Sequence, residues 1–347
     1  MTRVLVTGGA GFIGCNLVDR LARNGAEVLV LDSFARPGAE RNAAWLNARH
    51  GDRVRIARAD IRDPQAVEVA VATVDAVFHF AAQVAVTTSL ADPRADFSVN
   101  VEGAVNLLEA LRRRGASTPL IFSSTNKVYG DLADVALTRG ADGYAPQDQK
   151  LRACGVSEKR PLSFCTPYGC SKGAADQYVL DYAHSFGLPT AVMRMSCIYG
   201  PRQMGTEDQG WVAHFLIRAL GGETITLFGD GWQVRDILYV DDAVDAYLAA
   251  WRDMDRIKGR AFNLGGGPRN AVSLNGLLAY VERRLGRRLA IRYESWRPGD
   301  QRYYVSDSTR ARDELSLGEP VPWREGVTRL LAWLDGERGQ ARPEAAE

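Results

Sequence analysis

Thr7-Gly8-Gly9-Ala10-Gly11-Phe12-Ile13-Gly14 is the most informative stretch of the chain, because it joins a β-rich run, 3–7, to a run with apolar residues at helical spacing, 12–23. In such a turn the first glycine permits a tight bend, the second lets the backbone approach a pyrophosphate, and the third lets the helix and the strand pack closely. The N–H groups and the dipole of the helix then face the phosphate charge. We therefore expect a bound dinucleotide, held by Gly8, Gly11, Phe12, Ile13 and Gly14.

The next strand ends in an acid that indicates which dinucleotide binds. Asp32 closes the β-rich run 27–32, at a position where a carboxylate hydrogen-bonds a ribose 2′-hydroxyl and repels a 2′-phosphate. NAD is therefore expected as the cofactor, although Arg36 and Arg41 leave NADP open. After the following two strands, the adenine and the body of the cofactor are expected to meet Asp60, Ile61, Ala81 and Ala82.

Strand-like and helix-like segments alternate along the first half of the chain. This βαβ repetition predicts an α/β fold of Rossmann type: a doubly wound parallel sheet with helices on both faces, followed by a smaller C-terminal α+β lobe that binds substrate. Further strands are expected at 53–58, 75–81, 119–123 and 190–195, and further helices at 94–113 and 168–186. The stretch 131–166 is polar, contains Gly and Pro and lacks periodicity, which predicts a long functional or mobile loop.

The change of pattern near Gly200 predicts the domain organisation. Residues 1–198 are expected to form the NAD-binding Rossmann domain, together with a return segment around 234–265. Residues 199–338 are expected to form mainly the substrate-binding lobe. The tail 339–347 is charged, contains Pro and is rich in small residues, so we expect it to fray.

The composition argues against several classes of partner. The chain has 347 residues, 46% of them apolar and 24% charged, with a net charge of +1, so nothing favours nucleic acid or an anionic membrane as a partner. The five cysteines are odd in number and lack metal-binding spacing, so no metal site is expected. Since we find no signal peptide and no apolar run near the ~18 residues that a membrane span needs, we expect a cytoplasmic protein.

A tyrosine and a lysine on a predicted helix indicate redox chemistry at the cofactor. Tyr168 and Lys172 are four residues apart, so their side chains share one face. Tyrosine has an ordinary pKa of about 10, and we expect the lysine ammonium and the positive nicotinamide ring to lower it, so that the phenolate accepts a proton from a substrate hydroxyl. Thr125, just after the predicted strand 119–123, is expected to share the hydrogen bond to that hydroxyl.

These motifs, together with Gly200-Pro201-Arg202, Val234-Arg235-Asp236-Ile237-Leu238 and Arg297-Pro298-Gly299-Asp300, resemble the extended short-chain dehydrogenase/reductase family of sugar-nucleotide epimerases and dehydratases. The resemblance covers essentially the whole chain. It implies that bound NAD oxidises a hexose transiently and returns the hydride, that the substrate is a nucleotide-diphosphate sugar, and that the protein is a homo-oligomer, dimer or tetramer. It also implies that Arg235 and Arg297 clamp the substrate diphosphate. The cofactor site is then completed by Gln83, Asn100, Ser123 and Ser196, together with Tyr168 and Lys172. The further residues that the substrate is expected to meet are Asn126, Cys197, Arg202 and Gln209.

Two departures from the family pattern narrow the reaction. In the 4,6-dehydratases of the family, the catalytic threonine is followed by Asp and Glu, which eliminate water, whereas this chain has Asn126 and Lys127. An amide cannot protonate a leaving hydroxyl, so dehydration is disfavoured. Cys197 stands where many members have an Asn that contacts the nucleotide sugar, which implies a different pose of the substrate. We interpret Cys197 as a small packing residue, because this chemistry needs no thiol nucleophile.

Several strings resemble one branch of the family, which inverts C2 of a CDP-linked hexose: 83–89, 123–132, 167–183 and 208–212, with Arg202-Gln203 before the last. The implied mechanism has Tyr168 deprotonate the 2-hydroxyl while C2 gives a hydride to NAD, and a 2-keto sugar then presents its opposite face. The stretch 140–163 is less alike and is expected to touch the sugar. A UDP-hexose 4-epimerase acting on glucose or glucuronate, a dehydrogenase that releases its reduced cofactor, and a catalytically silent NAD sensor stay open, as do the nucleotide and the hexose.

Overall fold

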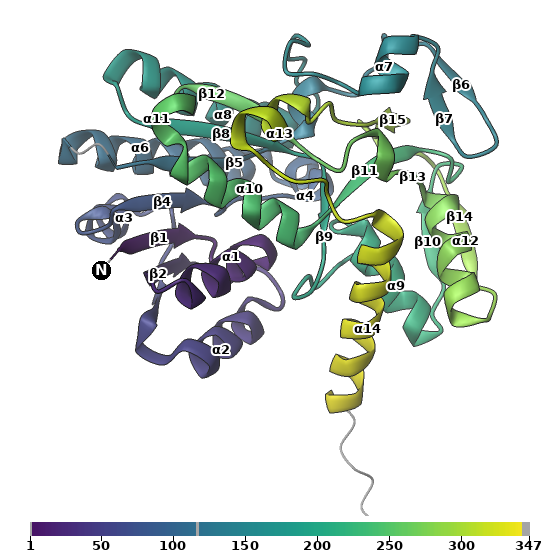
Figure 1. Cartoon of the computed structure of the whole chain (residues 1–347), viewed down its shortest axis with the longest axis horizontal. Helices are drawn as coiled ribbons and strands as arrows, with labels where there is room; N and C mark the ends of the chain where they lie inside the picture. Colours follow the sequence, from purple (N-terminus) through teal and green to yellow (C-terminus); the bar gives the residue numbers. More distant parts are fainter. Residues whose placement is uncertain (1, 116–117, 342–347) are drawn as a thin grey trace, which may run out of the picture.

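A computed structural model of the chain describes residues 2–115 and 118–341 (Figure 1). Its largest feature is a seven-stranded sheet in the order β12-β8-β5-β4-β1-β2-β3, in which every neighbouring pair is parallel. Because the strand order runs outward in both directions from β1, the sheet is doubly wound, and the predicted fold class is confirmed. The strands are β1 (Arg3–Thr7), β2 (Glu27–Asp32), β3 (Val54–Arg58), β4 (Ala76–His79), β5 (Leu120–Thr125), β8 (Thr190–Met195) and β12 (Arg260–Leu264).

Helices cover both faces of this sheet, which explains why its strands are continuous apolar runs. Val4, Leu5 and Val6 of β1 are all fully buried, and alternate residues belong to two different cores. One core is shared with α1 (Phe12–Arg23), α2 (Ala39–His50), α10 (Val240–Arg252), α11 (Met254–Ile257) and α13 (Thr309–Leu315). The other is shared with α3 (Pro64–Val71), α6 (Gly103–Arg114) and α8 (Thr166–Phe186).

The predicted helix 94–113 is interrupted. It consists of α5 (Pro93–Phe97), a π-helical segment (Ser98–Glu102) and α6, and it follows a short helix, α4 (Val86–Ala91). Hydrophobic periodicity does not reveal a single wide turn, and such turns are frequent at functional sites. The π segment carries Asn100, one of the residues expected at the cofactor.

The smaller lobe is built around β11 (Val234–Tyr239), which pairs with β9 (Cys197–Tyr199), β13 (Ala271–Ser273) and β15 (Tyr303–Tyr304). A two-stranded sheet of β10 (Ile225–Phe228) and β14 (Ile291–Glu294) lies beside it in the lobe. A third core joins these strands to α9 (Trp211–Gly221), α12 (Leu274–Leu285) and α14 (Trp323–Ala341). Within the predicted return segment around 234–265, Leu238 of β11 and helix α10 pack in the first core, and β12 pairs with β8 in the large sheet.

The stretch 131–166 is not free of regular structure, contrary to our expectation. It forms a small hairpin of β6 (Leu137–Arg139) and β7 (Tyr144–Pro146), then a short helix, α7 (Gln149–Cys154). Elements this short give no periodic signal. The hydroxyl of Tyr144 donates to Asp230 at 2.6 Å and thereby ties the hairpin to the smaller lobe.

The predicted frayed tail, 339–347, is described only in part. Of the tail that we expect to fray, 342–347 lie outside the described residues, whereas α14 continues to Ala341. Three short 3-10 turns complete the structure: Gly51–Arg53, Asn126–Tyr129 and Pro268–Asn270. Over residues 2–115 and 118–341, no helix is long and apolar enough to cross a membrane.

Candidate active site

The glycine turn between β1 and α1 fits a pyrophosphate. Gly8 has φ +68°, and a Cβ atom there would lie 2.6 Å from the backbone nitrogen of Ala81, while a Cβ atom at Gly14 would overlap the carbonyl oxygen of Gly8. Helix α1 follows at Phe12 with Gly11 as N-cap, with no side-chain cap and no acid in the first turn. The first N–H groups of a helix have no partner within the helix, so this end is suited to an anion.

Asp32 is fixed at the end of β2, beside that turn. Its carboxylate accepts hydrogen bonds from the backbone N–H groups of Ala10 at 3.0 Å and Phe34 at 2.9 Å. This geometry suits a ribose diol and disfavours an additional phosphate. Of the two arginines that left NADP open, Arg41 is paired with Glu337, whereas Arg36 is exposed.

The residues after β3 and β4 line the same edge of the sheet. Asp60 is held by Arg62 in a two-pronged ion pair at 2.7 and 2.9 Å, and hydrogen bonding to Arg62 lowers the pKa of the Asp60 carboxyl. Ile61 is buried against Gly103 of α6, where a Cβ atom would lie only 2.6 Å away. Ala81 adjoins the glycine turn, and Ala82 is the next residue along.

Gln83 and Asn100 form a buried hydrogen-bond network with an acid that the sequence analysis missed. The backbone N–H of Gln83 donates to the Asn100 side chain at 2.9 Å, and Asn100 donates to Ser171 of α8 at 3.0 Å. Asp96 accepts from the Gln83 amide at 2.8 Å, its second oxygen is buried without a partner, and burial raises its pKa. The network fixes the segment after β4 against α8 at Ser171, the residue before Lys172. A single acid in a short, mostly exposed helix carries no sequence signal of this kind.

Tyr168 and Lys172 lie on α8 and are both buried, at 8% and 3% exposure. The Lys172 ammonium donates to the carbonyl oxygen of Ser123 at 2.6 Å and lies 4.1 Å from the ring centre of Phe122. Burial lowers the pKa of Lys172 to about 7. Burial also raises the pKa of Tyr168 to about 12, which a hydrogen bond with Thr125 offsets only in part.

The side chains alone therefore do not lower the pKa of Tyr168, and the expected lowering, which includes the charge of the nicotinamide ring, stays a prediction. The same burial that protects Tyr168 also weakens the charge of Lys172, and the ammonium is directed to a backbone carbonyl. A phenolate at neutral pH consequently needs positive charge beyond that of the side chains, and the nicotinamide ring of NAD carries such a charge.

Residues at the end of β5 support the helix that carries Tyr168 and Lys172. The hydroxyl of Ser123 donates to the carbonyl of His79 at 2.9 Å, so only its backbone carbonyl faces Lys172. Ser124 donates to Asp176 at 2.7 Å, and Asp176 accepts two hydrogen bonds from Arg194, each 2.9 Å long. This buried ion pair joins α8 to β5 and β8. Thr125 caps the next turn by accepting from the backbone N–H of Lys127 at 3.2 Å.

Asn126 and Arg235, two residues that are predicted to bind substrate, meet at the loop that precedes β15. Arg235 is 7% exposed and donates to Asp300 at 2.8 Å and to the carbonyl of Gln301. Asn126 donates to the side chain of Gln301 at 3.4 Å, and Gln301 in turn donates to the carbonyl of Gly130 at 2.6 Å. The loop thus joins β11 to the end of β5.

Arg297, at the start of the same loop, is more exposed. Its guanidinium lies 3.7 Å from the ring centre of Phe228 and is paired with Glu207 at 3.2 Å and Asp208 at 3.4 Å. Gln209, the next residue, is half-buried, and its backbone pairs with that of Thr206. Arg297 and Gln209 are therefore brought together through one acidic segment.

Three other predicted residues contact neighbouring side chains of the protein. The guanidinium carbon of Arg202 lies 4.1 Å from the ring centre of Trp45 of α2 and 5.6 Å from that of Trp333 of α14, and its expected role in substrate binding stays a prediction. The hydroxyl of Ser196 is occupied by Asp236. The thiol of Cys197 accepts from the indole N–H of Trp211 at 3.3 Å, and burial raises its pKa, which matches a packing residue.

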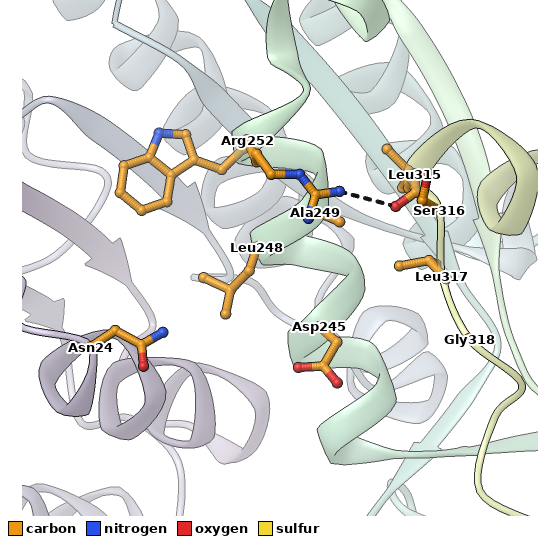
Figure 2. Close-up of a pocket in the computed structure, with 10 residues that line it drawn as sticks. Asn24, Asp245, Leu248, Ala249, Arg252, Leu315, Ser316, Leu317 and Gly318 are labelled. Carbon is orange, nitrogen blue, oxygen red and sulfur yellow. Dashed lines mark hydrogen bonds between the residues drawn. The ribbon is translucent and has the colours of Figure 1, made fainter.

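A surface groove of about 620 Å³ lies away from these residues (Figure 2). It is bordered by Asn24 at the end of α1, by α10 and by residues 315–318, and Arg252 donates across it to the carbonyl of Leu315 at 3.2 Å. None of the predicted site residues lines this groove, and we assign it no chemistry.

Comparisons with known proteins converge on one family. The family model described as "NAD dependent epimerase/dehydratase family" matches residues 4–265. CDP-paratose 2-epimerase of Salmonella typhi is 38% identical over 95% of this chain and 98% of its own length. UDP-glucose 4-epimerase of Mycolicibacterium smegmatis is 34% identical over 96% and 98%. The structure of Thermus thermophilus UDP-glucose 4-epimerase in complex with NAD is similar with a TM-score of 0.81 at 32% identity, over 96% of this chain and 99% of that one.

Proposed function

The chain belongs to the NAD-dependent epimerase/dehydratase family, and within this family we propose that it inverts C2 of a CDP-linked hexose through a 2-keto sugar. The family and its cofactor, NAD, were both predicted from the sequence and are confirmed. The proposal concerns the carbon that is inverted, the nucleotide and the roles of the individual residues.

The observation that carries the proposal is the replacement of an acid pair by Asn126 and Lys127, directly after Thr125. Thr125 is hydrogen-bonded to Tyr168, so this pair of residues flanks the place where a substrate hydroxyl would bind. Without a carboxyl group there to protonate a leaving hydroxyl, epimerisation is favoured over dehydration. The CDP-paratose 2-epimerase relative, at 38% identity, supports C2 and cytidine.

In the proposed mechanism, the glycine turn 8–14 and Asp32 would hold NAD, which would supply a reversible hydride acceptor for C2. Tyr168, as the phenolate, takes the proton of the 2-hydroxyl, and the hydroxyl of Thr125 holds the same oxygen by a hydrogen bond. Lys172, one turn further along α8 than Tyr168, is anchored to the carbonyl of Ser123 and thereby positions the helix against the end of β5. After the keto sugar has turned its opposite face, Tyr168 returns the proton to the 2-oxygen.

Inversion at C4 of a UDP-hexose is a second candidate. It is supported by UDP-glucose 4-epimerase relatives at 31% and 34% identity, the first of them named as putative. Cys197, in the place of the Asn that many family members have, argues for a different pose of the sugar and therefore against it.

Product NMR after incubation with a panel of nucleotide sugars tests the proposal. The panel contains CDP-paratose, other CDP-hexoses, UDP-glucose and UDP-glucuronate, each with the NAD-loaded enzyme. We expect inversion at C2 of CDP-paratose or of a closely related CDP-hexose. Inversion only at C4 of a UDP-sugar would overturn the proposal in favour of the second candidate.

A further inference from the structure

Lys127 is held rigidly beside the proposed catalytic threonine. It follows Thr125 by two residues, and its backbone N–H donates to the Thr125 hydroxyl at 3.2 Å. Its carbonyl oxygen packs on α8 at Gly169, the residue after Tyr168. A Cβ atom at Gly169 would lie 3.3 Å from this oxygen. The side chain is partly buried, and its ammonium donates to the carbonyl of Gly299 at 3.1 Å. Lys127 therefore spans from the end of β5 to the loop before β15.

The surroundings of this ammonium carry more positive charge than one acid balances. Asp300 acts on Lys127 and is at the same time the ion-pair partner of Arg235, at 2.8 Å. Two cations thus share one carboxylate in a partly buried place, and burial lowers the pKa of Lys127. Buried charges require a partner to offset the loss of hydration. An anionic group of a ligand supplies such a partner.

The chemistry of a nucleotide sugar indicates which anion this is. In a hexose, C2 is bonded to the anomeric carbon, which carries the diphosphate, whereas C4 lies on the far side of the ring. When C2 faces Tyr168 and Thr125, the anomeric oxygen and its phosphate therefore come to lie next to Thr125, close to Lys127. When C4 faces them, this neighbouring place is taken by C5 and its substituent.

We infer that Lys127 binds the β-phosphate of the nucleotide sugar and thereby selects C2 as the carbon that faces Tyr168. The inference rests on the proposed 2-epimerase function and adds a specificity-determining residue to it. Lys127, anchored to the carbonyl of Gly299, and Arg235, paired with the neighbouring Asp300, then bind one diphosphate between them, and Lys127 contacts the phosphate nearer the sugar. A cation two residues after Thr125 has no such partner in an enzyme that presents C4 of a neutral hexose.

Binding of matched nucleotides to the NAD-loaded protein tests this inference without any turnover. CDP has a β-phosphate and CMP lacks it, so their affinities isolate the contact. A hydrogen bond between charged groups contributes about 1.5–3 kcal/mol, so we expect Lys127→Met to weaken CDP about 10-fold or more and to leave CMP unchanged within about twofold. Lys127→Arg, which keeps the charge, should retain much of the CDP affinity. Lys258→Met, at an exposed lysine after α11, is the matched control and should change neither.

Three results would overturn the inference: an equal loss for the diphosphate and the monophosphate of the same nucleoside, no loss for either CDP or UDP, or a loss of affinity for UDP-glucuronate that does not occur for UDP-glucose. The last would mean that Lys127 binds a sugar carboxylate at C5. UDP and UMP are measured in parallel, so that a β-phosphate effect with uridine nucleotides only would keep the role of Lys127 and refute the assignment of cytidine. If Lys127→Met does not fold, Lys127→Gln replaces it, with the same expected separation of CDP from CMP.

Discussion

On the proposed cofactor side of the site, Tyr168 and Lys172 lie on one long helix, and Lys172 is anchored to the backbone of a buried strand at Ser123. On the proposed substrate side, Arg235 and Arg297 are each paired with an acid from a loop. The first arrangement is fixed by regular secondary structure. In the second, cation–carboxylate pairs hold the charges, and a bound phosphate has to compete with these acids. We therefore expect changes on the cofactor side to affect turnover and changes on the substrate side to affect binding.

The largest effect is expected on the cofactor side, from Tyr168→Phe. A positioned acid–base group contributes about 10²–10⁴-fold to a rate, so kcat should fall by about 1,000-fold or more. NAD and nucleotide should still bind, because the ring is retained and only its hydroxyl is lost. Single-turnover kinetics and nucleotide titration measure the two properties separately. Unchanged epimerisation would exclude Tyr168 as the base, and loss of NAD binding would show that the variant affects more than turnover.

The packing of α8 against β5 and β8, on the cofactor side, should depend on the buried ion pair of Arg194 and Asp176. Their side chains are 5% and 0% exposed. Arg194→Met leaves Asp176 buried without its partner, so we expect a loss of about 3–5 kcal/mol in the free energy of unfolding. Glu207→Gln, in the more exposed pair with Arg297, is the matched variant on the substrate side and should cost less than about 1 kcal/mol. Chemical denaturation measures both. Similar losses for the two variants would contradict the difference between the sides.

Within the substrate side, Arg235 should matter more for binding than Arg297. The side chain of Arg235 is 8% exposed and that of Arg297 is 25% exposed, so solvent screens the contacts of Arg235 less. We expect Arg235→Met to weaken CDP about 10- to 100-fold and Arg297→Met by less than about 10-fold, in line with 1.5–3 kcal/mol for a charged hydrogen bond that is well buried. Isothermal titration at two salt concentrations measures this. A larger loss for Arg297→Met would reverse the order that the structure implies.

The smallest effect is a pH dependence of stability from Lys172. Burial lowers its pKa from 10.5 to about 7 in the folded protein, so between these values the unfolded chain binds more protons and stability rises with pH. The difference in unfolding free energy between wild type and Lys172→Met should therefore grow in favour of wild type by about 1 kcal/mol per pH unit from about pH 7 to pH 9. Denaturation at several pH values measures the slope. A difference that stays flat or falls as the pH rises would show that folding does not lower the pKa of Lys172.

Much of the cofactor side was predictable because its signals are local in sequence. The bounds of β1, α1, β2 and β8 agree with the predicted runs. The glycine turn, Asp32 and the pair Tyr168–Lys172 each lie within one element or one turn, so periodicity and spacing suffice to identify them. The pKa of Tyr168 was not predictable, because it depends on how deeply α8 is buried.

The substrate side was less predictable because its geometry depends on contacts between distant segments. Arg202 follows a family motif, yet it packs between Trp45 and Trp333, and no local pattern in the sequence predicts this packing. The partners of Arg235 and Lys127 come from the loop before β15, far along the chain. Such pairings follow from the packing of the smaller lobe against the end of β5.

A CDP-hexose labelled with deuterium at C2 provides the decisive measurement for the proposed chemistry. The NAD-loaded enzyme is incubated with labelled CDP-paratose in ordinary water, and the product is examined by NMR. We expect a sugar that is inverted at C2 and that retains its deuterium there, since the hydrogen removed from C2 is returned to the same carbon. Inversion at C2 with loss of the label to water would contradict this mechanism. Retention of configuration at C2 of the CDP-hexose, together with inversion at C4 of a UDP-hexose, would also contradict it.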